Sequence, residues 1–420
     1  MDISVIKRKR IVYLVFATAT LLVLGLIYAW SIFRVPIGDA NPDYKPLLAQ
    51  VFQVSMFTFC VSALFGAQIF KRVSPRAAIF VAALLLGVGF IVTALCSSFG
   101  IWVVFVFYGV FAASGCGIGY NAIISLINPW FPDKTGFCSG VMMMGYGISS
   151  LVFGSLANAA FAVIDWTAVF IIIAIVDVAI MSVLAMVVKT APADIASKLG
   201  MQGVAASTKA SPTKNQSILK TKTMWLFAIW STFLVMCGLV LIGSSGQGAA
   251  VLGMASFAPL MVGLVSTTNG LSRVINGLIF DRFGLLVVMR LSAVLTILTM
   301  AGLAIAYGMN GAGISPVLYV VSGILAAFPY GSLPVMASAF VRQRYNPAVF
   351  ANNLGIVNCN IGVGAILNII IAAFLGAPDA GNGAAVFGIL AVLAVVALLS
   401  TFVFARSFTS DLKQIAKELQ

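Results

Sequence analysis

Twelve long apolar runs follow one another along the chain, and short stretches with charged residues, Pro or Gly separate them. Every run reaches the roughly 20 residues that a helix needs to cross a membrane. The pattern therefore predicts an all-α integral membrane protein with twelve transmembrane helices. The predicted spans are 11–35, 50–70, 76–98, 101–128, 137–161, 166–188, 223–245, 250–280, 285–307, 314–341, 350–375 and 383–406.

The stretch between the sixth and seventh runs is longer and more polar than the other gaps. Residues 189–222 contain six Lys and one Asp among many Ala, Ser and Thr, which is typical of a solvated linker. We expect a short surface helix within it, at 192–201. The predicted organisation is an N-terminal six-helix bundle at 1–188, a cytoplasmic linker at 189–222 and a C-terminal six-helix bundle with a tail at 223–420.

Composition excludes several classes of protein. The chain is 61% hydrophobic and only 8% charged, too few charged residues to cover the surface of a soluble fold. A cytosolic enzyme, a disordered chain and a nucleic-acid partner are therefore not expected. His is absent and the six Cys show no CxxC spacing, so the sequence offers no His-metal site or Ser-His-Asp triad. We expect no cofactor and no metal.

The net charge of +13 has a topological meaning in a membrane protein. Of 24 Lys and Arg residues, 21 fall in the two tails, the linker and the gaps on the same side. The gaps on the other side hold only Arg34 and Lys45. Because basic residues gather on the cytoplasmic side, we expect a multi-pass protein of the cell inner (plasma) membrane with both termini in the cytoplasm.

Two ionisable residues lie deep within predicted spans, Arg273 in the eighth and Asp177 in the sixth. Ser266, Asn269, Arg273 and Asn276 follow a spacing that places them on one helix face. A charge in a span is costly, so this face should line an aqueous path or meet a partner. Anion binding by Arg273 is favoured over a structural ion pair, for which Asp177 is the available counter-ion. For Asp177 we favour a structural hydrogen bond or salt bridge over a proton-carrying role.

Further polar candidates lie in four other spans, and for each an interhelical hydrogen bond competes with a contact to a ligand. They are Tyr28 in the first span, Tyr120 and Asn121 in the fourth, Tyr330 in the tenth, and Asn358 and Cys359 in the eleventh.

Several short motifs resemble those of a known family. They are Gly66–Arg76 after the second span, Asp281–Gly284 after the eighth, Gly25–Phe33 in the first, Trp130–Gly136 after the fourth and Asn353–Ile356 in the eleventh. Together they resemble the Major Facilitator Superfamily, and within it the oxalate/formate antiporter family and the related monocarboxylate transporters. The resemblance covers nearly the whole chain and implies two pseudo-symmetric six-helix bundles that alternate access to a site between them.

The resemblance also implies roles for particular residues. A substrate carboxylate would be held by Arg273 with Tyr28, Tyr120 and Tyr330, and Asn269, Asn121, Asn276, Asn358 and Cys359 are further candidates for the same site. The loop motifs would form an inner gate from Asp281, Arg282, Lys71, Arg72 and Arg76, although Lys71 stands where the family usually has Asp.

Two departures from the family pattern bear on the substrate. Ile361 stands where oxalate-exchanging members carry a Lys, so a dianion would lack a second cation and a monocarboxylate such as lactate, pyruvate, formate or acetate is favoured. Asn269 stands where animal-type monocarboxylate carriers place an Asp linked to proton coupling, which leaves proton symport and anion exchange both open.

The resulting hypothesis is a secondary active carrier of small monocarboxylates that is not an enzyme and acts as a monomer. Its expected partners are the carboxylate, a proton or counter-anion and the lipid bilayer. The alternatives are an exchanger of oxalate or another dicarboxylate, an exporter of another metabolite or drug, and a membrane sensor. The sensor would need a sizeable soluble output domain, which the sequence does not offer.

Overall fold

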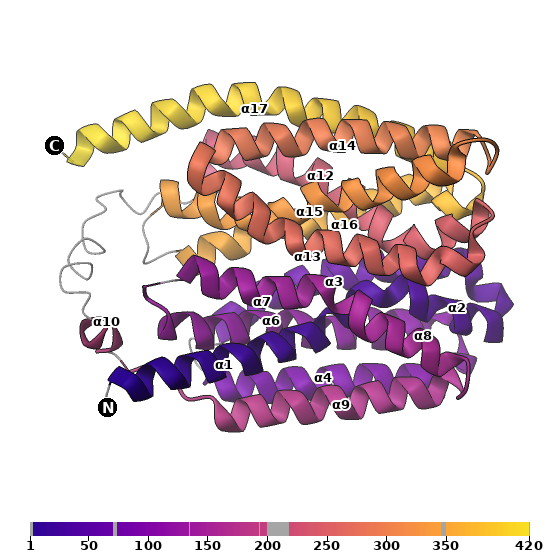
Figure 1. Cartoon of the computed structure of the whole chain (residues 1–420), viewed down its shortest axis with the longest axis horizontal. Coiled ribbons are helices and arrows are strands. Elements are labelled where there is room, and N and C mark those ends of the chain that lie inside the picture. The colour runs from indigo at the N-terminus through magenta and orange to yellow at the C-terminus, as the bar shows by residue number, and fades with distance from the viewer. Residues whose placement is uncertain are drawn as a thin grey trace.

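The computed structural model describes residues 3–69, 74–133, 135–192, 194–199, 218–345 and 350–419, and this part of the chain consists of helices and short connections without a strand. The long helices run in roughly the same direction, and both chain termini lie at one end of the molecule (Figure 1). We call this the terminal end and the other the opposite end.

The N-terminal half supplies six helical crossings, and several of them are interrupted by 3-10 or π-helical segments. Its elements are α1 (Ile3–Leu24), η1 (Gly25–Ala29), α2 (Trp30–Ala40), η2 (Pro42–Tyr44), α3 (Lys45–Ile69), α4 (Pro75–Cys96), η3 (Ser97–Phe99), α5 (Ile101–Val103), η4 (Val104–Ala112), α6 (Ala113–Ile127), η5 (Asn128–Trp130), α7 (Thr135–Ser149), η6 (Ser150–Gly154), α8 (Ser155–Phe161) and α9 (Trp166–Val187).

The C-terminal half has six long helices with fewer interruptions. After α10 (Ile195–Lys198) and η7 (Ile218–Lys220) come α12 (Lys222–Val251), η8 (Ala255–Phe257), α13 (Ala258–Phe283), α14 (Leu285–Gly308), α15 (Ser315–Arg344), α16 (Phe350–Leu375), η10 (Pro378–Ala380) and α17 (Gly383–Leu419). The short helix expected at 192–201 corresponds to α10 within the described residues.

Each predicted span coincides with a helical crossing, so the twelve-helix prediction is confirmed. The ends differ most in three places: the first crossing begins at Ile3, the last helix continues to Leu419, and α13 begins at Ala258 rather than at residue 250. This last difference has a backbone cause. Gly253 has φ +83°, in the left-handed region, and separates α12 from α13.

Eleven helices in the described part of the chain are long and apolar enough to cross a membrane, and α13 is not among them. Its 26 residues include the polar face with Ser266, Asn269, Arg273 and Asn276, which lowers its mean hydropathy. The helix predicted to hold the substrate cation is therefore the least apolar of the twelve crossings, as a helix lining an aqueous path should be.

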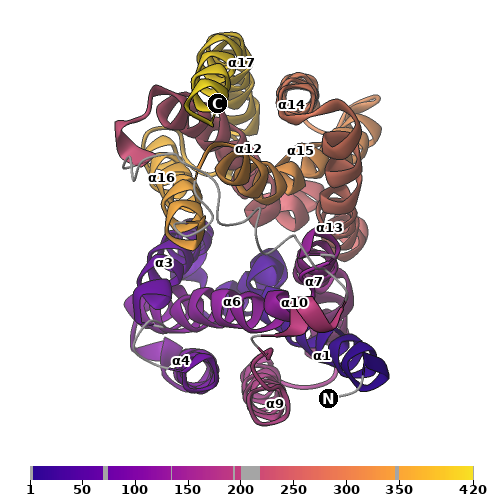
Figure 2. The same cartoon turned by 90° about the vertical axis from the view of Figure 1, so that its left-hand side faces the viewer.

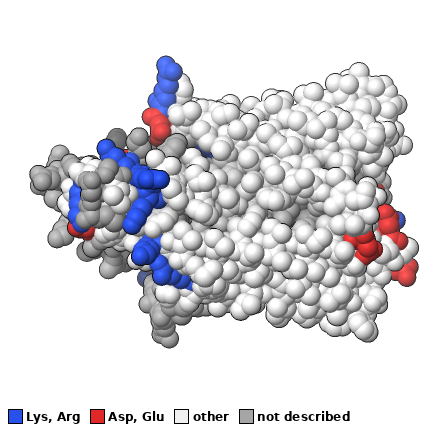
Figure 3. Space-filling view, turned by 60° about the horizontal axis from the view of Figure 1, so that its bottom comes forward, with Lys and Arg blue, Asp and Glu red and all other residues white. Residues whose placement is uncertain are grey.

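The surface fits a bilayer. Figure 3 shows a broad surface zone without charged side chains between the two ends, with Lys and Arg gathered at the terminal end. Large apolar side chains are exposed on this zone, for example Leu84 on α4, Leu298 on α14 and Leu399 on α17. Such a surface is stable in lipid and not in water.

The two halves meet along two pairs of helices. In Figure 2, seen from the terminal end, α3 lies beside α16 and α7 lies beside α13, and these pairs make the most extensive packing between the halves. The α7–α13 contact depends on glycine. A Cβ added to Gly147 would lie 2.6 Å from Cα of Gly270, and one added to Gly270 would lie 3.1 Å from the backbone N of Ile148.

We expect Gly147→Ala to lower the free energy of unfolding by about 1–3 kcal/mol, because the added methyl group meets backbone that cannot move aside easily. Thermal unfolding of the purified protein in detergent measures the effect. Gly140→Ala is the matched control on the same helix, since a Cβ there meets no atom within 4 Å. Equal melting temperatures for the two variants would contradict the close-packing argument.

Candidate functional site

Arg273 lies near the middle of α13 and is 4% exposed. Its Nη1 donates a hydrogen bond to the carbonyl O of Met143 on α7, at 2.9 Å. Its Nε is buried without a hydrogen-bond partner. None of the ion pairs among the described residues includes Arg273. The site therefore contains a fixed positive charge whose neutralising anion is not supplied by the described chain.

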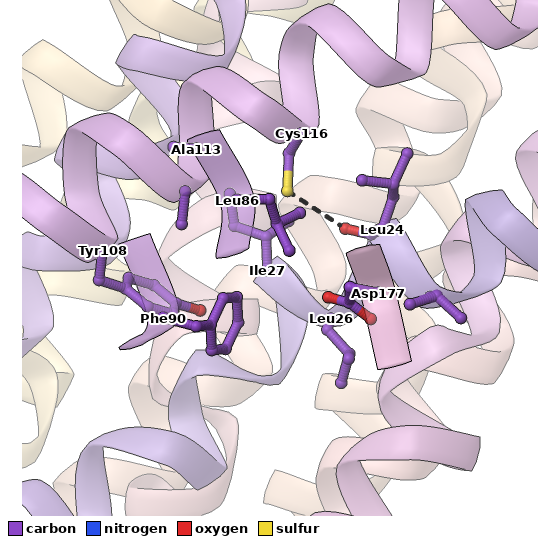
Figure 4. Close-up of a pocket in the computed structure, with 11 residues that line it drawn as sticks. Leu24, Leu26, Ile27, Leu86, Phe90, Tyr108, Ala113, Cys116 and Asp177 are labelled. Atoms are coloured by element: carbon purple, nitrogen blue, oxygen red, sulfur yellow. Dashed lines mark hydrogen bonds between the residues drawn. The ribbon is translucent and has the colours of Figure 1, made fainter. Parts of the chain in front are cut away.

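Asp177, the counter-ion suggested by the sequence, does not neutralise Arg273. It lies on α9 and lines a small cavity with residues of α1, η1, α4, η4 and α6, all within the N-terminal half (Figure 4). Its Oδ2 has no hydrogen-bond partner, and the ion pairs of the described residues do not include it. The structural hydrogen bond or salt bridge that we favoured for Asp177 is therefore wrong for this structure.

The polar face of α13 is buried, and its members contact two different helices. Ser266 Oγ donates to the carbonyl O of Gly147 on α7 at 2.6 Å. Asn276 Nδ2 donates to the carbonyl O of Ser272 at 2.8 Å and to that of Phe328 on α15 at 3.5 Å. The Oδ1 atom of Asn269 has no partner. Ser266 and Asn276 thus connect α13 to its neighbours. Free bonding capacity remains at Arg273 Nε, Asn269 Oδ1 and Asn276 Oδ1.

Tyr28 and Tyr330 meet between the two halves. Tyr28 lies in η1, the 3-10 segment that interrupts the first crossing, and Tyr330 follows a Pro within α15. Their hydroxyl oxygens are 3.3 Å apart and both side chains are buried. A 3-10 turn and an internal Pro each interrupt the regular backbone hydrogen bonds of an α-helix. Each interruption changes the direction in which the nearby Tyr side chain points.

These tyrosines belong to a larger group of rings that we call the aromatic cluster. Its members are Tyr28, Phe52, Phe59, Tyr120, Tyr146 and Tyr330, and neighbouring ring centroids lie 5.2–6.4 Å apart. Tyr146 on α7 is central, since its ring contacts those of Tyr28, Phe59 and Tyr120. The cluster gives the site an apolar wall that carries phenolic hydroxyl groups.

The aromatic cluster lies beside Arg273. Gly147, the residue after Tyr146, lies against the Arg273 side chain, since a Cβ added there would lie 3.6 Å from Nε. The carbonyl that binds Arg273, that of Met143, lies on the same helix as Tyr146. The structure thus brings together Arg273, Tyr28, Tyr120 and Tyr330, the set implied by the sequence resemblance.

Sequence reasoning missed Tyr146. The available signal was weak, because Tyr146 is the one Tyr of the fifth crossing and follows the apolar run Met142–Met144. It also missed the Met143 contact, for which no signal existed because the acceptor is a backbone carbonyl.

Other predicted site residues contact the protein itself. Asn121 Nδ2 donates to the carbonyl O of Ala63 on α3 at 2.8 Å, a hydrogen bond between helices. Cys359 Sγ donates to the carbonyl O of Gly355, one turn earlier in α16, at 3.4 Å. Asn358 is half-buried on the same helix.

The predicted gate residues are only partly described. Asp281 and Arg282 are exposed at the end of α13, where the Arg282 guanidinium lies 5.2 Å from the ring centroid of Phe283. Arg76 donates from Nε and Nη2 to the carbonyl O of Val188, at 3.1 and 3.0 Å, and so satisfies an otherwise free carbonyl at the end of α9. Lys71 and Arg72 lie outside the described residues.

At the opposite end, polar contacts join the two halves. Arg34 on α2 forms an ion pair with Asp379 in η10, with Nη2 and Oδ2 2.6 Å apart. Gln247 Nε2 on α12 donates to the carbonyl O of Ser31 at 2.6 Å. These contacts close the space between the candidate site at Arg273 and the opposite end of the molecule.

The arrangement suits one small anion. A guanidinium presents several N–H donors in a plane that matches a carboxylate, and the phenols can donate to the same oxygens. Among the described residues, no group of three His, Cys, Asp or Glu could hold a metal ion.

Comparisons with known proteins agree with this architecture. The family model of the Major Facilitator Superfamily matches residues 11–351. The chain is 24% identical over 363 residues to the uncharacterised MFS-type transporter YhjX of Escherichia coli (strain K12), covering 86% of this chain and 87% of that protein. It is 22% identical over 407 residues to the oxalate:formate antiporter of Oxalobacter formigenes, covering 95% of this chain and 92% of that protein.

Solved structures share the fold. A partially occluded inward-open structure of the xylose transporter XylE from E. coli has a TM-score of 0.71 at 15% identity, covering 94% of this chain and 98% of that one. A structure of the nucleoside transporter NupG has a TM-score of 0.67 at 16% identity, covering 94% and 99%. At this identity the likeness concerns the fold alone.

Proposed function

The chain belongs to the Major Facilitator Superfamily, and from this premise we propose that it is a secondary active transporter of small monocarboxylate anions. Lactate, pyruvate, formate and acetate are the substrates that we consider. The carrier would work by alternating access, as a proton symporter or an anion exchanger, with the anion bound between the two halves.

One observation carries the proposal: Arg273 is a buried cation without a carboxylate partner among the described residues. A lone buried charge is unfavourable until an anion neutralises it. A monocarboxylate does so with one negative charge, and its apolar part can pack against the aromatic cluster. Tyr28, Tyr120, Tyr330 and Tyr146 would donate hydrogen bonds to the carboxylate. The unpartnered Oδ1 of Asn269 could accept one from the hydroxyl group of lactate.

The single cation also bears on substrate charge. Ile361 on α16 is partly buried and packs against the apolar core, so this position offers no second positive charge. A dianion such as oxalate would keep one negative charge unneutralised in a site of low dielectric. We therefore place oxalate below the monocarboxylates in affinity.

We further propose an orientation and a division of the chain. The gathering of Lys and Arg at the terminal end supports a cytoplasmic location for both termini, in the plasma membrane. Residues 1–188 and 223–420 would then be the two moving bundles, joined by the linker 189–222. Asp281, Arg282, Arg76, Lys71 and Arg72 would form the gate at the cytoplasmic side.

Uptake into proteoliposomes tests the proposed function. The purified full-length protein is reconstituted, and labelled lactate, pyruvate, formate, acetate and oxalate are offered in turn. Liposomes without protein give the background, since small acids cross bilayers unaided. We expect saturable uptake of at least one monocarboxylate, inhibited by the others and less by oxalate.

A second candidate is exchange of oxalate or another dicarboxylate, which the oxalate:formate antiporter among the relatives favours. Preferential uptake of oxalate into vesicles preloaded with formate would establish it instead. Uptake of none of the five acids above the background, with or without preloaded formate, would rule out the monocarboxylate proposal and oxalate exchange. It would leave a carrier of another dicarboxylate or an exporter of another metabolite.

A further inference from the structure

A second polar site lies inside the N-terminal half, away from Arg273. Asp177 on α9 and Tyr108 on η4 line the same cavity, and both side chains are 1% exposed (Figure 4). The Asp177 Oδ2 and the Tyr108 hydroxyl are buried and have no hydrogen-bond partner. The cavity has a volume of about 10 Å³, close to the smallest that admits one water molecule. Two unpartnered polar groups thus share a space of the size of a single water.

Among the residues that the structure describes, no cation lines this cavity with Asp177. The titratable groups that line it besides Asp177 are Tyr108 of η4 and Cys116 of α6, and the lining residues from α1, η1 and α4 are apolar. The adjoining helix α8 has no titratable residue. A carboxylate here would be buried without a counter-charge, which costs far more than burying the neutral acid. The conformation described here therefore accommodates Asp177 with its proton bound.

The cavity is joined to the substrate site by the break in the first crossing. Leu26 and Ile27 of η1 line the cavity, and the carbonyl O of Leu24 accepts a hydrogen bond from Cys116 Sγ at 3.5 Å. The next residue along η1 is Tyr28, which belongs to the aromatic cluster. One 3-10 segment therefore contacts both sites, and a 3-10 stretch within a helix often marks a hinge.

We propose that Asp177 is the proton-binding site of this carrier and that η1 couples it to the substrate site. Asp177 is the one acidic residue within the predicted spans, and Asn269 beside Arg273 has an amide that does not take up a proton. The inference rests on the proposed function, since the proton would accompany the monocarboxylate. On release, the O–H bond of the Asp177 carboxyl breaks, the proton passes to a water molecule, and the carboxylate keeps the electron pair. The carboxylate then attracts water into the cavity, which displaces Leu26 and Ile27 and with them Tyr28.

Transport by Asp177→Asn, a permanently neutral variant, tests the coupling. A pH gradient of one unit, acid outside, should accumulate lactate about tenfold in vesicles with the wild type. With Asp177→Asn we expect no accumulation but continued exchange of labelled for unlabelled lactate at equal pH. The matched control is Asp165→Asn, at the exposed start of the same helix. There hydrogen bonds from Thr167 hold the pKa of Asp165 below its usual value, and Asn can replace it as the helix cap.

A measurement that needs no substrate separates this inference from the proposed function. Hydrogen–deuterium exchange of the peptide with Gly25–Ala29, corrected for the intrinsic rate, should rise with pH in the wild type and stay constant in Asp177→Asn. If Asp177→Asn does not fold, the smaller Asp177→Ser takes its place.

The outcomes are distinct. Gradient-driven accumulation that survives in the neutral variant, or a wild type that exchanges lactate without responding to the gradient, overturns the inference and leaves the proposed function standing. A wild type that transports no monocarboxylate overturns the proposed function. The pH dependence of hydrogen–deuterium exchange in η1 then tests Asp177 alone. If this pH dependence disappears in Asp177→Asn, the result supports Asp177 as a proton-binding site, and if the wild type and Asp177→Asn depend on pH equally, the inference is overturned.

Discussion

Arg273→Ala should reduce uptake of the monocarboxylate by about 30-fold or more. Removing one partner of a buried, hydrogen-bonded charge pair costs about 2–5 kcal/mol, and about 2 kcal/mol already corresponds to a factor of about 30 in affinity. The initial rate of uptake into proteoliposomes, measured over a range of substrate concentrations, shows the effect. Arg273→Lys should be intermediate, because an ammonium keeps the charge and loses the planar set of donors.

The stability of Arg273→Ala distinguishes a binding role from a structural one. Within the described part of the chain, Arg273 makes one hydrogen bond, to the carbonyl O of Met143, and has no carboxylate partner. Removing a buried cation that is not neutralised also removes its desolvation cost. We therefore expect a melting temperature equal to or above that of the wild type, together with the loss of uptake.

The matched control is Arg406→Ala. Arg406 is exposed on α17, a helix that packs mainly against α14 and α12 rather than against α13. The Arg406→Ala variant should transport the substrate as fast as the wild type. Undiminished uptake by Arg273→Ala would contradict the assigned site, and a large fall in its melting temperature would show that Arg273 holds the helices together instead.

The helices of this protein are readable from the sequence because their signals are local. A run of apolar residues between charges determines a crossing wherever it occurs, and the spacing of Ser266, Arg273 and Asn276 determines a shared helix face. Both expectations hold in the structure. Interruptions are harder to predict, since nothing in Gly25–Ala29 apart from its glycine distinguishes it from a regular apolar helix.

Contacts between helices cannot be predicted in this way, because the periodicity of a sequence does not indicate which other helix a side chain will contact. Asp177 was considered as a counter-ion for Arg273 since both are charges within spans, yet it faces a cavity of the N-terminal half. Asn121, a candidate for the substrate site, donates to the carbonyl O of Ala63, a partner that helical spacing could not indicate. Arg34 and Asp379 form an ion pair although 345 residues separate them.

The Arg34–Asp379 ion pair leads to the second large prediction, which concerns conformation. The pair joins α2 of one half to η10 of the other at the opposite end of the molecule. The Arg34 side chain is 5% exposed and that of Asp379 is 21% exposed, so the pair lies between the exposed and the fully buried case. Exposed pairs contribute about 0–1 kcal/mol, and breaking buried ones costs about 3–5 kcal/mol. We take about 2 kcal/mol for this pair.

Asp379→Asn should therefore shift the equilibrium away from the closed opposite end by about 30-fold. A cysteine placed at Ser245, which lines a small buried cavity beside Tyr28, reports this opening in a background where the six native Cys are replaced. Its rate of reaction with a membrane-impermeant maleimide should rise in Asp379→Asn and stay unchanged in Asp43→Asn, an exposed acid at the same end.

The reversed pair, Arg34→Asp with Asp379→Arg, tests whether the attraction itself closes the molecule. If it does, the double variant should react more slowly than either single variant, because the ion pair forms again with its charges exchanged. Labelling rates that simply add from the two single changes would show that each residue acts separately, and an unchanged rate in Asp379→Asn would show that the packing of α2 against α12 closes this end without the ion pair.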